Sequence, residues 1–218
     1  VVSVWAMPDL KEKVPAHEEK LPVMPILRQR PVQWLFASIF FHVLSHVSIY
    51  AFFSLYLDSL GYGKSMIGVL WGVAIVVEVI WFFTQGFWMP HLSLTAWLVL
   101  CALVMLARMG MTAAGAMVLP LLVLAQALHA ITFAAHHSVC VALISHHFPG
   151  RLRGRGQALF TVTAYGVPGV LGGLTGGALS ARFGLSAVFW ACLATSALAC
   201  VCALQVWRFA HPRVHAAR

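Results

Sequence analysis

The sequence of 218 residues predicts an all-α, polytopic membrane protein with six membrane-spanning helices. Hydrophobic residues make up 61% of the chain and charged residues only 9%, and the mean hydropathy is +0.88. Soluble domains carry about 25% charged residues, so this composition indicates an integral membrane protein. The apolar runs are long and unbroken, unlike the short alternating segments of a transmembrane β-barrel, which predicts helical spans.

Six apolar segments are long enough to cross a bilayer, which takes about 20 helical residues. We predict spans at Val32–Leu57, Ser65–Trp88, Leu92–Met111, Met117–Ile144, Gln157–Ala181 and Leu185–Phe209. The segments between them are short, so we expect the six antiparallel helices to form one bundle.

Residues 7–31 are polar and contain several prolines, and residues 1–6 (VVSVWA) resemble the end of a preceding transmembrane helix. We therefore divide the chain into three parts: 1–31, the end of a preceding helix and a cytoplasmic linker; 32–210, the six-helix unit; and 211–218, a short cytoplasmic tail. Because no initiator methionine or signal-peptide pattern precedes this arrangement, we expect the chain to be the later part of a longer protein.

The basic residues between spans predict the orientation. An even number of spans places both termini on one side, and that side carries most of the Lys and Arg residues: Lys11, Lys13, Lys20, Arg28, Arg30, Arg151, Arg153, Arg155, Arg208, Arg213 and Arg218. The opposite side has only Lys64 and Arg182. Positive charge favours the cytoplasmic side, so both ends are predicted to be cytoplasmic and the protein to be multi-pass in the cell inner (plasma) membrane.

The net charge of +8 does not indicate nucleic-acid binding, because most of the basic residues lie between spans rather than in a patch interleaved with aromatic residues. The five cysteines all fall within apolar runs, which is typical of packing residues rather than of a disulfide framework. The sequence predicts no cofactor, and the lipid bilayer is its expected surrounding.

Glu78 is the one acidic residue within the second span. A carboxylate at that depth costs several kcal/mol unless it is protonated, paired or hydrated, so Glu78 is a candidate for proton coupling or substrate recognition. Trp71 and Gln85 share its helical face, while Trp81 and Phe82 flank it. Such an aromatic wall suits an amphipathic organic ligand; alternatively these rings face lipid, and Glu78 belongs to a purely structural buried pair.

Arg108 is the second intramembrane charge, in the third span. Because arginine keeps its proton, it needs a carboxylate, carbonyls, water or an anionic ligand there. The alternative is that its side chain extends to the far interface, since only a few residues separate it from the next loop.

The fourth span carries a polar stripe at steps of three and four residues, which places its members on one helical face. The stripe consists of Gln126, His129, Phe133, His136 and Cys140, bordered by Thr132. It predicts the lining of a cavity, although single histidines in helices are more often packing residues.

In the first span, the spacing of His42 and His46 would allow both to bind one metal ion, but without acidic partners we expect cavity lining or interhelical hydrogen bonding instead. The fifth span has glycines at 169, 172, 173, 176 and 177 after Pro168. Small residues at this spacing allow close helix packing, or a helix that bends or slides during a transport cycle.

Several of these segments resemble a known family. LAQALHAITFAAHHSV (Leu124–Val139) and FPGRLRGRGQALF (Phe148–Phe160) are similar to the tenth and eleventh transmembrane segments of the major facilitator superfamily, in particular its phenylpropionic-acid transporter branch, which is related to the lactose permease and nucleoside symporters. The glutamate of VVEVIWFF and the arginine of LARMG match the eighth and ninth segments. The loop MPH departs from the family, because it lacks the usual basic residues.

The resemblance implies the six-helix C-terminal half of a twelve-helix carrier, whose partner would be a missing N-terminal six-helix half. It implies proton-coupled symport of a small organic solute, an aromatic carboxylate such as a phenylpropionate. The proton-coupling residues would be Glu78, His129 and His136. The substrate-binding residues would be Arg108, Gln126, Trp71, Trp81 and His42.

Other functions remain open at this stage. Sugar or nucleoside symporters and drug efflux carriers share the fold. A membrane di-iron enzyme would use histidine clusters, but no HxxHH box is present and His42 and His46 lie in mid-span. A membrane scaffold or sensor is the third alternative.

Overall fold

The computed structural model describes residues 22–211, and within that range the chain is helical, with short connections. Six helical segments are long and apolar enough to cross a membrane: Arg30–Ser59, Lys64–His91, Leu94–Gly115, Leu119–His147, Gly150–Phe183 and Leu185–Ala210. This confirms the predicted all-α fold with six spans. The predicted helix end at 1–6 and most of the tail at 211–218 lie outside the described residues.

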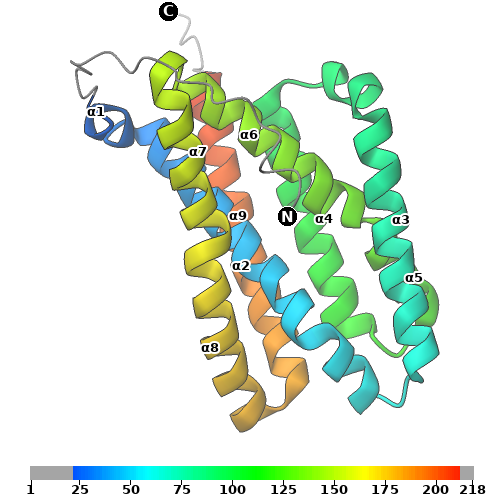
Figure 1. The fold of residues 1–218 in the computed structure, drawn as a ribbon. Helices are drawn as coiled ribbons and strands as arrows, with labels where there is room; N and C mark the ends of the chain where they lie inside the picture. The colour runs from blue at the N-terminus through cyan, green and yellow to red at the C-terminus, as the bar shows by residue number, and fades with distance from the viewer. Residues whose placement is uncertain (1–21, 212–218) are drawn as a thin grey trace, which may run out of the picture.

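The helices follow one another in the order shown in Figure 1. Their bounds are α1 (Met24–Leu27), α2 (Arg30–Ser59), α3 (Lys64–Trp88), η2 (Met89–His91), α4 (Leu94–Gly115), α5 (Leu119–Ala127), η3 (Ala130–Ala135), α6 (His136–His147), η4 (Gly150–Leu152), α7 (Arg153–Thr161), η5 (Val162–Gly166), α8 (Val167–Phe183) and α9 (Leu185–Ala210).

The fifth span begins earlier than the sequence suggested. We expected it to start at Gln157, but a 3₁₀ turn leads directly into α7 at Arg153. The close approach of α7 to Phe148 depends on Gly156, because a Cβ atom there would lie 2.7 Å from the side chain of Phe148. The glycine therefore lets the new helix start against the end of α6.

The helices α2 and α9 pack against each other and contact most of the other helices of the bundle. In Figure 1, α9 lies beside α2 and α4, and α8 covers α2, while α3 runs beside α5 and η3. The first and last described residues lie at the same end of the bundle, as an even number of spans requires. The spans Lys64–His91 and Gly150–Phe183 are the least buried, so they form the more open sides of the unit.

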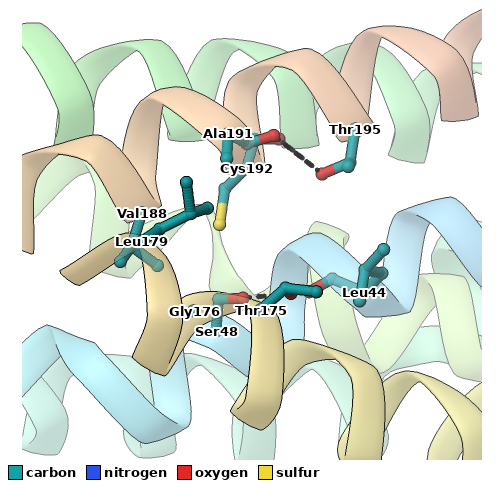
Figure 2. A pocket seen from close by; sticks show the side chains of 9 residues that line it. All are labelled: Leu44, Ser48, Thr175, Gly176, Leu179, Val188, Ala191, Cys192 and Thr195. Carbon is teal, nitrogen blue, oxygen red and sulfur yellow. Dashed lines mark hydrogen bonds between the residues drawn. The ribbon is translucent and has the colours of Figure 1, made fainter. Parts of the chain in front are cut away.

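The glycines of the fifth span have two different surroundings. Gly172 and Gly176 are buried against α2, and a Cβ atom on Gly176 would collide with the ring of Phe52. Figure 2 shows the small cavity beside this contact, about 40 Å³ between α2, α8 and α9. A Cβ atom added to Gly169, Gly173 or Gly177 would meet nothing within 4 Å among the described residues. One glycine face thus provides close helix contact, and the other leaves one narrow face of α8 without side chains.

Candidate functional site

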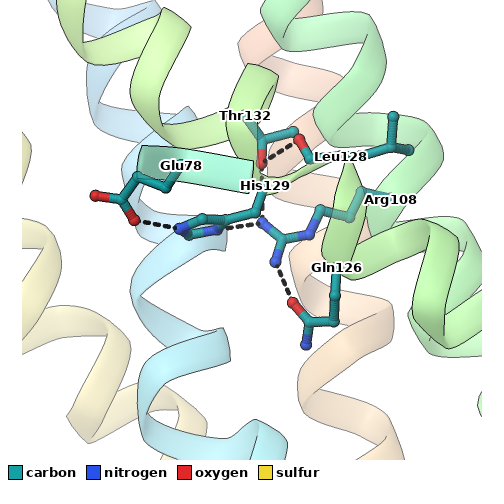
Figure 3. Close-up of polar contacts among 6 residues, drawn as sticks. All are labelled: Glu78, Arg108, Gln126, Leu128, His129 and Thr132. Atoms are coloured by element: carbon teal, nitrogen blue, oxygen red, sulfur yellow. Dashed lines mark hydrogen bonds and ion pairs between the residues drawn. The ribbon is translucent and has the colours of Figure 1, made fainter. Parts of the chain in front are cut away.

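Arg108 lies at the centre of a polar network deep in the bundle. Its side chain is only 1% exposed, so it does not extend to the far interface, and that alternative is wrong. The guanidinium Nη2 donates to Oε1 of Gln126 at 2.8 Å, and Nη1 donates to Oγ1 of Thr132 at 2.8 Å. Nη1 also lies 3.3 Å from Nδ1 of His129 (Figure 3). α4 therefore supplies one buried cation, and the fourth span supplies three uncharged partners for it.

The position of the guanidinium determines the tautomer of His129. Arginine has only donor groups, so Nδ1 of His129 accepts and carries no proton. A neutral imidazole then carries its proton on Nε2, which lies 3.1 Å from Oε2 of Glu78. His129 consequently donates to the Glu78 carboxylate, and the imidazole connects the cation of α4 to the carboxylate of α3.

The two ends of this line differ in exposure. The side chain of Glu78 is 26% exposed and that of His129 is 3% exposed. Arg108 is enclosed by its partners, so a molecule approaching the network meets Glu78 first. Arg108 and Glu78 therefore do not pair directly in this structure, because the imidazole of His129 lies between them.

A π-helical segment places these side chains. The fourth span changes from α-helix to π-helix at η3 (Ala130–Ala135). A π-helix makes hydrogen bonds between residues five apart, and single turns of this kind are frequent at functional sites. Thr132, just after the start of this segment, contacts the guanidinium together with Gln126 and His129, whereas the ring of Phe133 stacks on His129. The single stripe expected from regular α-helical spacing is thus divided into two groups.

The same π-helix exposes a backbone carbonyl. The N–H of His136, which an α-helix would direct to the carbonyl of Thr132, bonds instead to the carbonyls of Ile131 and Phe133. Nε2 of His42, on α2, donates to the carbonyl of Thr132 at 2.7 Å. Thr132 therefore connects both halves of the site, since its hydroxyl contacts Arg108 and its carbonyl contacts His42.

The second group of polar residues joins α2 to α6. The rings of His42 and His136 stack with centroids 3.6 Å apart and an interplanar angle of 4°. Sγ of Cys140 lies 3.4 Å from Nε2 of His136. All three side chains are buried, which places the predicted residues His42 and His136 together but in a separate group from Glu78.

Aromatic rings lie between the two groups. The rings of Phe133 and His129 stack at 5.1 Å, and Phe133 also lies 5.3 Å from the ring of His46. Tyr50 stacks on Trp71 at 5.7 Å and meets His129 edge-on at 6.4 Å. The predicted substrate residue Trp71 therefore belongs to an aromatic surface close to the network.

Trp81 does not belong to this surface, contrary to the expected aromatic wall. Its side chain is buried in the hydrophobic core and packs edge-to-face on Trp97, with ring centroids 5.5 Å apart. Phe82 is 39% exposed on the surface of α3. In this structure the ring of Trp81 therefore packs against α4 and does not line the aromatic surface beside His129.

Three residues of the site are not among the predicted proton-coupling or substrate-binding residues: Thr132, His46 and Tyr50. The helical spacing of His42, His46 and Tyr50, four residues apart, was the available signal on α2. Thr132 borders the predicted stripe of the fourth span, but the spacing alone does not indicate its contact with Arg108. Within residues 22–211, no group of three or more His, Cys, Asp or Glu side chains is arranged to hold a metal ion.

Comparisons with known proteins identify the family of the chain. Residues 3–191 match the MFS_1 like family. Over 122 residues, the chain is 30% identical to the "Probable 3-phenylpropionic acid transporter" of Escherichia coli (strain K12). That alignment covers 56% of this chain and 32% of the relative, so the chain spans well under two thirds of the relative's length. No solved structure matches the chain.

Proposed function

The chain belongs to the MFS_1 like family of the major facilitator superfamily, and from that premise we propose that it is the C-terminal half of a proton-coupled symporter for an aromatic carboxylate. The family match and the phenylpropionate-transporter relative confirm the resemblance noted in the sequence. Because both are transporters, the alternative that the chain is a membrane di-iron enzyme is excluded. In the proposed carrier this bundle faces a six-helix N-terminal half in the cell inner membrane, with both of its ends cytoplasmic.

The observation that carries the proposal is the line of contacts from Glu78 through His129 to Arg108 (Figure 3). With Glu78 ionised and His129 neutral, one negative and one positive charge balance within the group. A proton on Glu78 removes the negative charge and leaves the group with a net charge of about +1. Since an uncompensated charge in the membrane interior is costly, the protonated group favours an anionic ligand.

Coupling follows from this balance of charges. Once Glu78 is protonated, the Nε2–H group of His129 no longer faces a carboxylate and can donate to the carboxylate of a substrate. Arg108 is buried and does not contact the substrate directly. Its positive charge attracts the substrate carboxylate, and its hydrogen bond to Nδ1 of His129 keeps the proton of the imidazole on Nε2. Proton and substrate thus occupy the site together, which is the requirement for symport.

The substrate class is supported by the composition of the surrounding surface. Tyr50, Trp71 and Phe133 provide aromatic faces beside His129. Gln126 holds the guanidinium, and His42 and His136 line the space next to it. A ring that carries a carboxylate fits these elements better than a sugar, which would need more hydrogen-bonding groups. The name of the relative, a probable transporter of 3-phenylpropionic acid, agrees with this choice.

Uptake into proteoliposomes by the complete carrier tests the proposal, with an inward proton gradient and radiolabelled phenylpropionate. Wild type should accumulate the acid, and Glu78→Gln should lose gradient-driven accumulation because the glutamine cannot take up a proton. Asp58→Asn, which changes an exposed carboxylate near the end of α2, is the matched control and should behave as wild type. Undiminished accumulation by Glu78→Gln would refute the coupling role, and uptake of sugars, nucleosides or drugs in place of the acid would refute the substrate class.

A further inference from the structure

An open groove lies between α2 and α9, at the end of the bundle where the first and last described residues lie. It has a volume of about 580 Å³. None of its residues takes part in the polar network around Arg108. The residues that line this α2–α9 groove are Arg30, Gln33, Trp34, Ala37, Gln205 and Phe209.

The two helices present one face each to the groove. Its lining residues recur at steps of three and four along α2 and of four along α9, so each set shares one helical face. Oγ of Ser38 donates to the carbonyl of Ala199 at 3.3 Å, which joins the two helices just below the groove. At about 1.5 Å per residue, Arg30 lies roughly 12 Å from the level of that contact and Gln205 roughly 9 Å. The groove therefore covers the last two turns of each helix.

The chemical character of the groove changes along α2. Arg30 is nearest to the end of the bundle, a glutamine and Trp34 follow, and Ala37 is the deepest residue of this face. Trp34 is 36% exposed and Phe209, on α9, is 43% exposed, so both rings are accessible to lipid. A cation, then amides, then apolar surface is the order that suits a phospholipid, whose phosphate is followed by ester groups and acyl chains.

The polar side chains of the groove have no partner within the part of the chain that the structure describes. Arg30, Gln33 and Gln205 make no hydrogen bond or ion pair there. The acidic residues between 22 and 211 are Asp58, at the other end of α2, and Glu78, in the polar network. The positive charge of the groove is therefore available to a phosphate, and no described carboxylate is available to the ammonium group of a zwitterionic lipid.

The position of the groove favours a lipid over a soluble anion. This end of the bundle is the predicted cytoplasmic end, and Arg28 and Arg208 add further positive charge there. The cytoplasmic leaflet contains anionic lipids, and basic pockets between membrane-spanning helices on this side bind their headgroups. Tryptophan is also common at the level of the headgroups.

We propose that the α2–α9 groove binds an anionic phospholipid of the cytoplasmic leaflet, and that it prefers phosphatidylglycerol to phosphatidylethanolamine and phosphatidylcholine. Arg30 binds the phosphate, the amides of Gln33 and Gln205 bind the hydroxyls of the glycerol headgroup, and an acyl chain lies over Trp34 and Ala37. The inference goes beyond the proposed function, and its test requires no transported substrate.

The test is thermal unfolding of the delipidated complete carrier in a neutral detergent, with each of the three lipids added at increasing concentration. A ligand that binds only the folded protein raises the Tm as its concentration increases. Phosphatidylglycerol should therefore raise the Tm of wild type, and phosphatidylcholine with the same acyl chains should raise it least. Inorganic phosphate should have no effect, because it has no acyl chain to place in the groove.

Substitutions at Arg30 connect the effect to the groove. In Arg30→Gln, the concentration of phosphatidylglycerol that gives half of the maximal shift should increase about fivefold, the ratio expected for one arginine at an anionic membrane surface. Arg30→Lys should retain most of the affinity. Arg151→Gln, which changes an exposed arginine of η4 outside the groove, is the matched control and should behave as wild type.

The Tm without lipid shows whether the variants are folded. Because Arg30 is exposed, Arg30→Gln should then unfold at the wild-type temperature. Equal shifts with phosphatidylglycerol and phosphatidylcholine, or equal affinities of wild type and Arg30→Gln, would overturn the inference. A shift with inorganic phosphate as large as that with phosphatidylglycerol would overturn it in favour of a site for free anions. A decreased Tm of Arg30→Gln without lipid, together with no response of wild type to phosphatidylglycerol, would overturn it in favour of a contact with acidic residues of the linker.

Discussion

Thr132 allows the hydrogen-bond network around Arg108 to be tested with a nearly isosteric change. In Thr132→Val, the hydroxyl that accepts from Nη1 of Arg108 at 2.8 Å is replaced by a methyl group. Both residues are β-branched, so the helix itself is little affected. The change leaves a donor of a buried, charged group without its best partner.

The magnitude follows from the charge of the donor and from its burial. A hydrogen bond to a charged group contributes about 1.5–3 kcal/mol, and the guanidinium is only 1% exposed and cannot turn to water. We therefore expect Thr132→Val to destabilise the carrier by about 2 kcal/mol. For a protein of about 150–250 residues, that corresponds to a decrease of roughly 4–8 °C in the apparent Tm, and the decrease is smaller in a larger protein.

Thr112 provides the matched control. It is also a buried threonine close to Arg108, but its hydroxyl donates to the backbone carbonyl of Arg108 within the same helix, at 2.9 Å. Such local bonds to the preceding turn contribute little, so Thr112→Val should cost less than about 1 kcal/mol. The assay is thermal unfolding of the purified carrier in detergent. Equal shifts in Tm for the two variants would refute the view that the guanidinium depends on Thr132.

Two other predictions concern helix packing and charge. Gly176→Ala should lower the Tm by several degrees, because the added methyl group would collide with the ring of Phe52. Gly173→Ala is the control and should leave the Tm unchanged, because a Cβ atom there meets nothing within 4 Å. Equal shifts of the two variants in thermal unfolding would contradict the assignment of the two glycine faces. If one proton on Glu78 accompanies one monocarboxylate anion, each transport cycle moves no net charge. Uptake should then respond to the pH gradient but not to a membrane potential imposed across the liposome with potassium and valinomycin. A current driven by the membrane potential would contradict this stoichiometry.

Much of the fold could be predicted from the sequence because the lipid bilayer allows few kinds of secondary structure to cross it. A chain that crosses the hydrocarbon core must satisfy its backbone hydrogen bonds internally, so each long apolar run becomes a helix, and five of the six predicted spans agree with the structure to within a few residues. The exception, at Gln157, lies where polar residues form helix against the end of another helix.

The candidate residues could be predicted for a related reason. Charges are rare inside membranes because they are costly, which directs attention to Glu78 and Arg108 without any knowledge of their neighbours. Helical spacing then adds Gln126 and His129, and both contact Arg108 in the structure. Their roles in transport remain proposals.

The tertiary structure decided which of these residues meet and in what order. Arg108 reaches Glu78 only through His129, and a π-helical turn leaves the carbonyl of Thr132 free to accept from His42 while its hydroxyl contacts Arg108. The sequence AITFAA has no composition that distinguishes a π-helix from an α-helix. The sequence by itself therefore determined the number of spans and which spans carry a charge, since these follow from the transfer of single residues into lipid. The contacts depended on how the helices pack and turn against one another, which no single segment specifies.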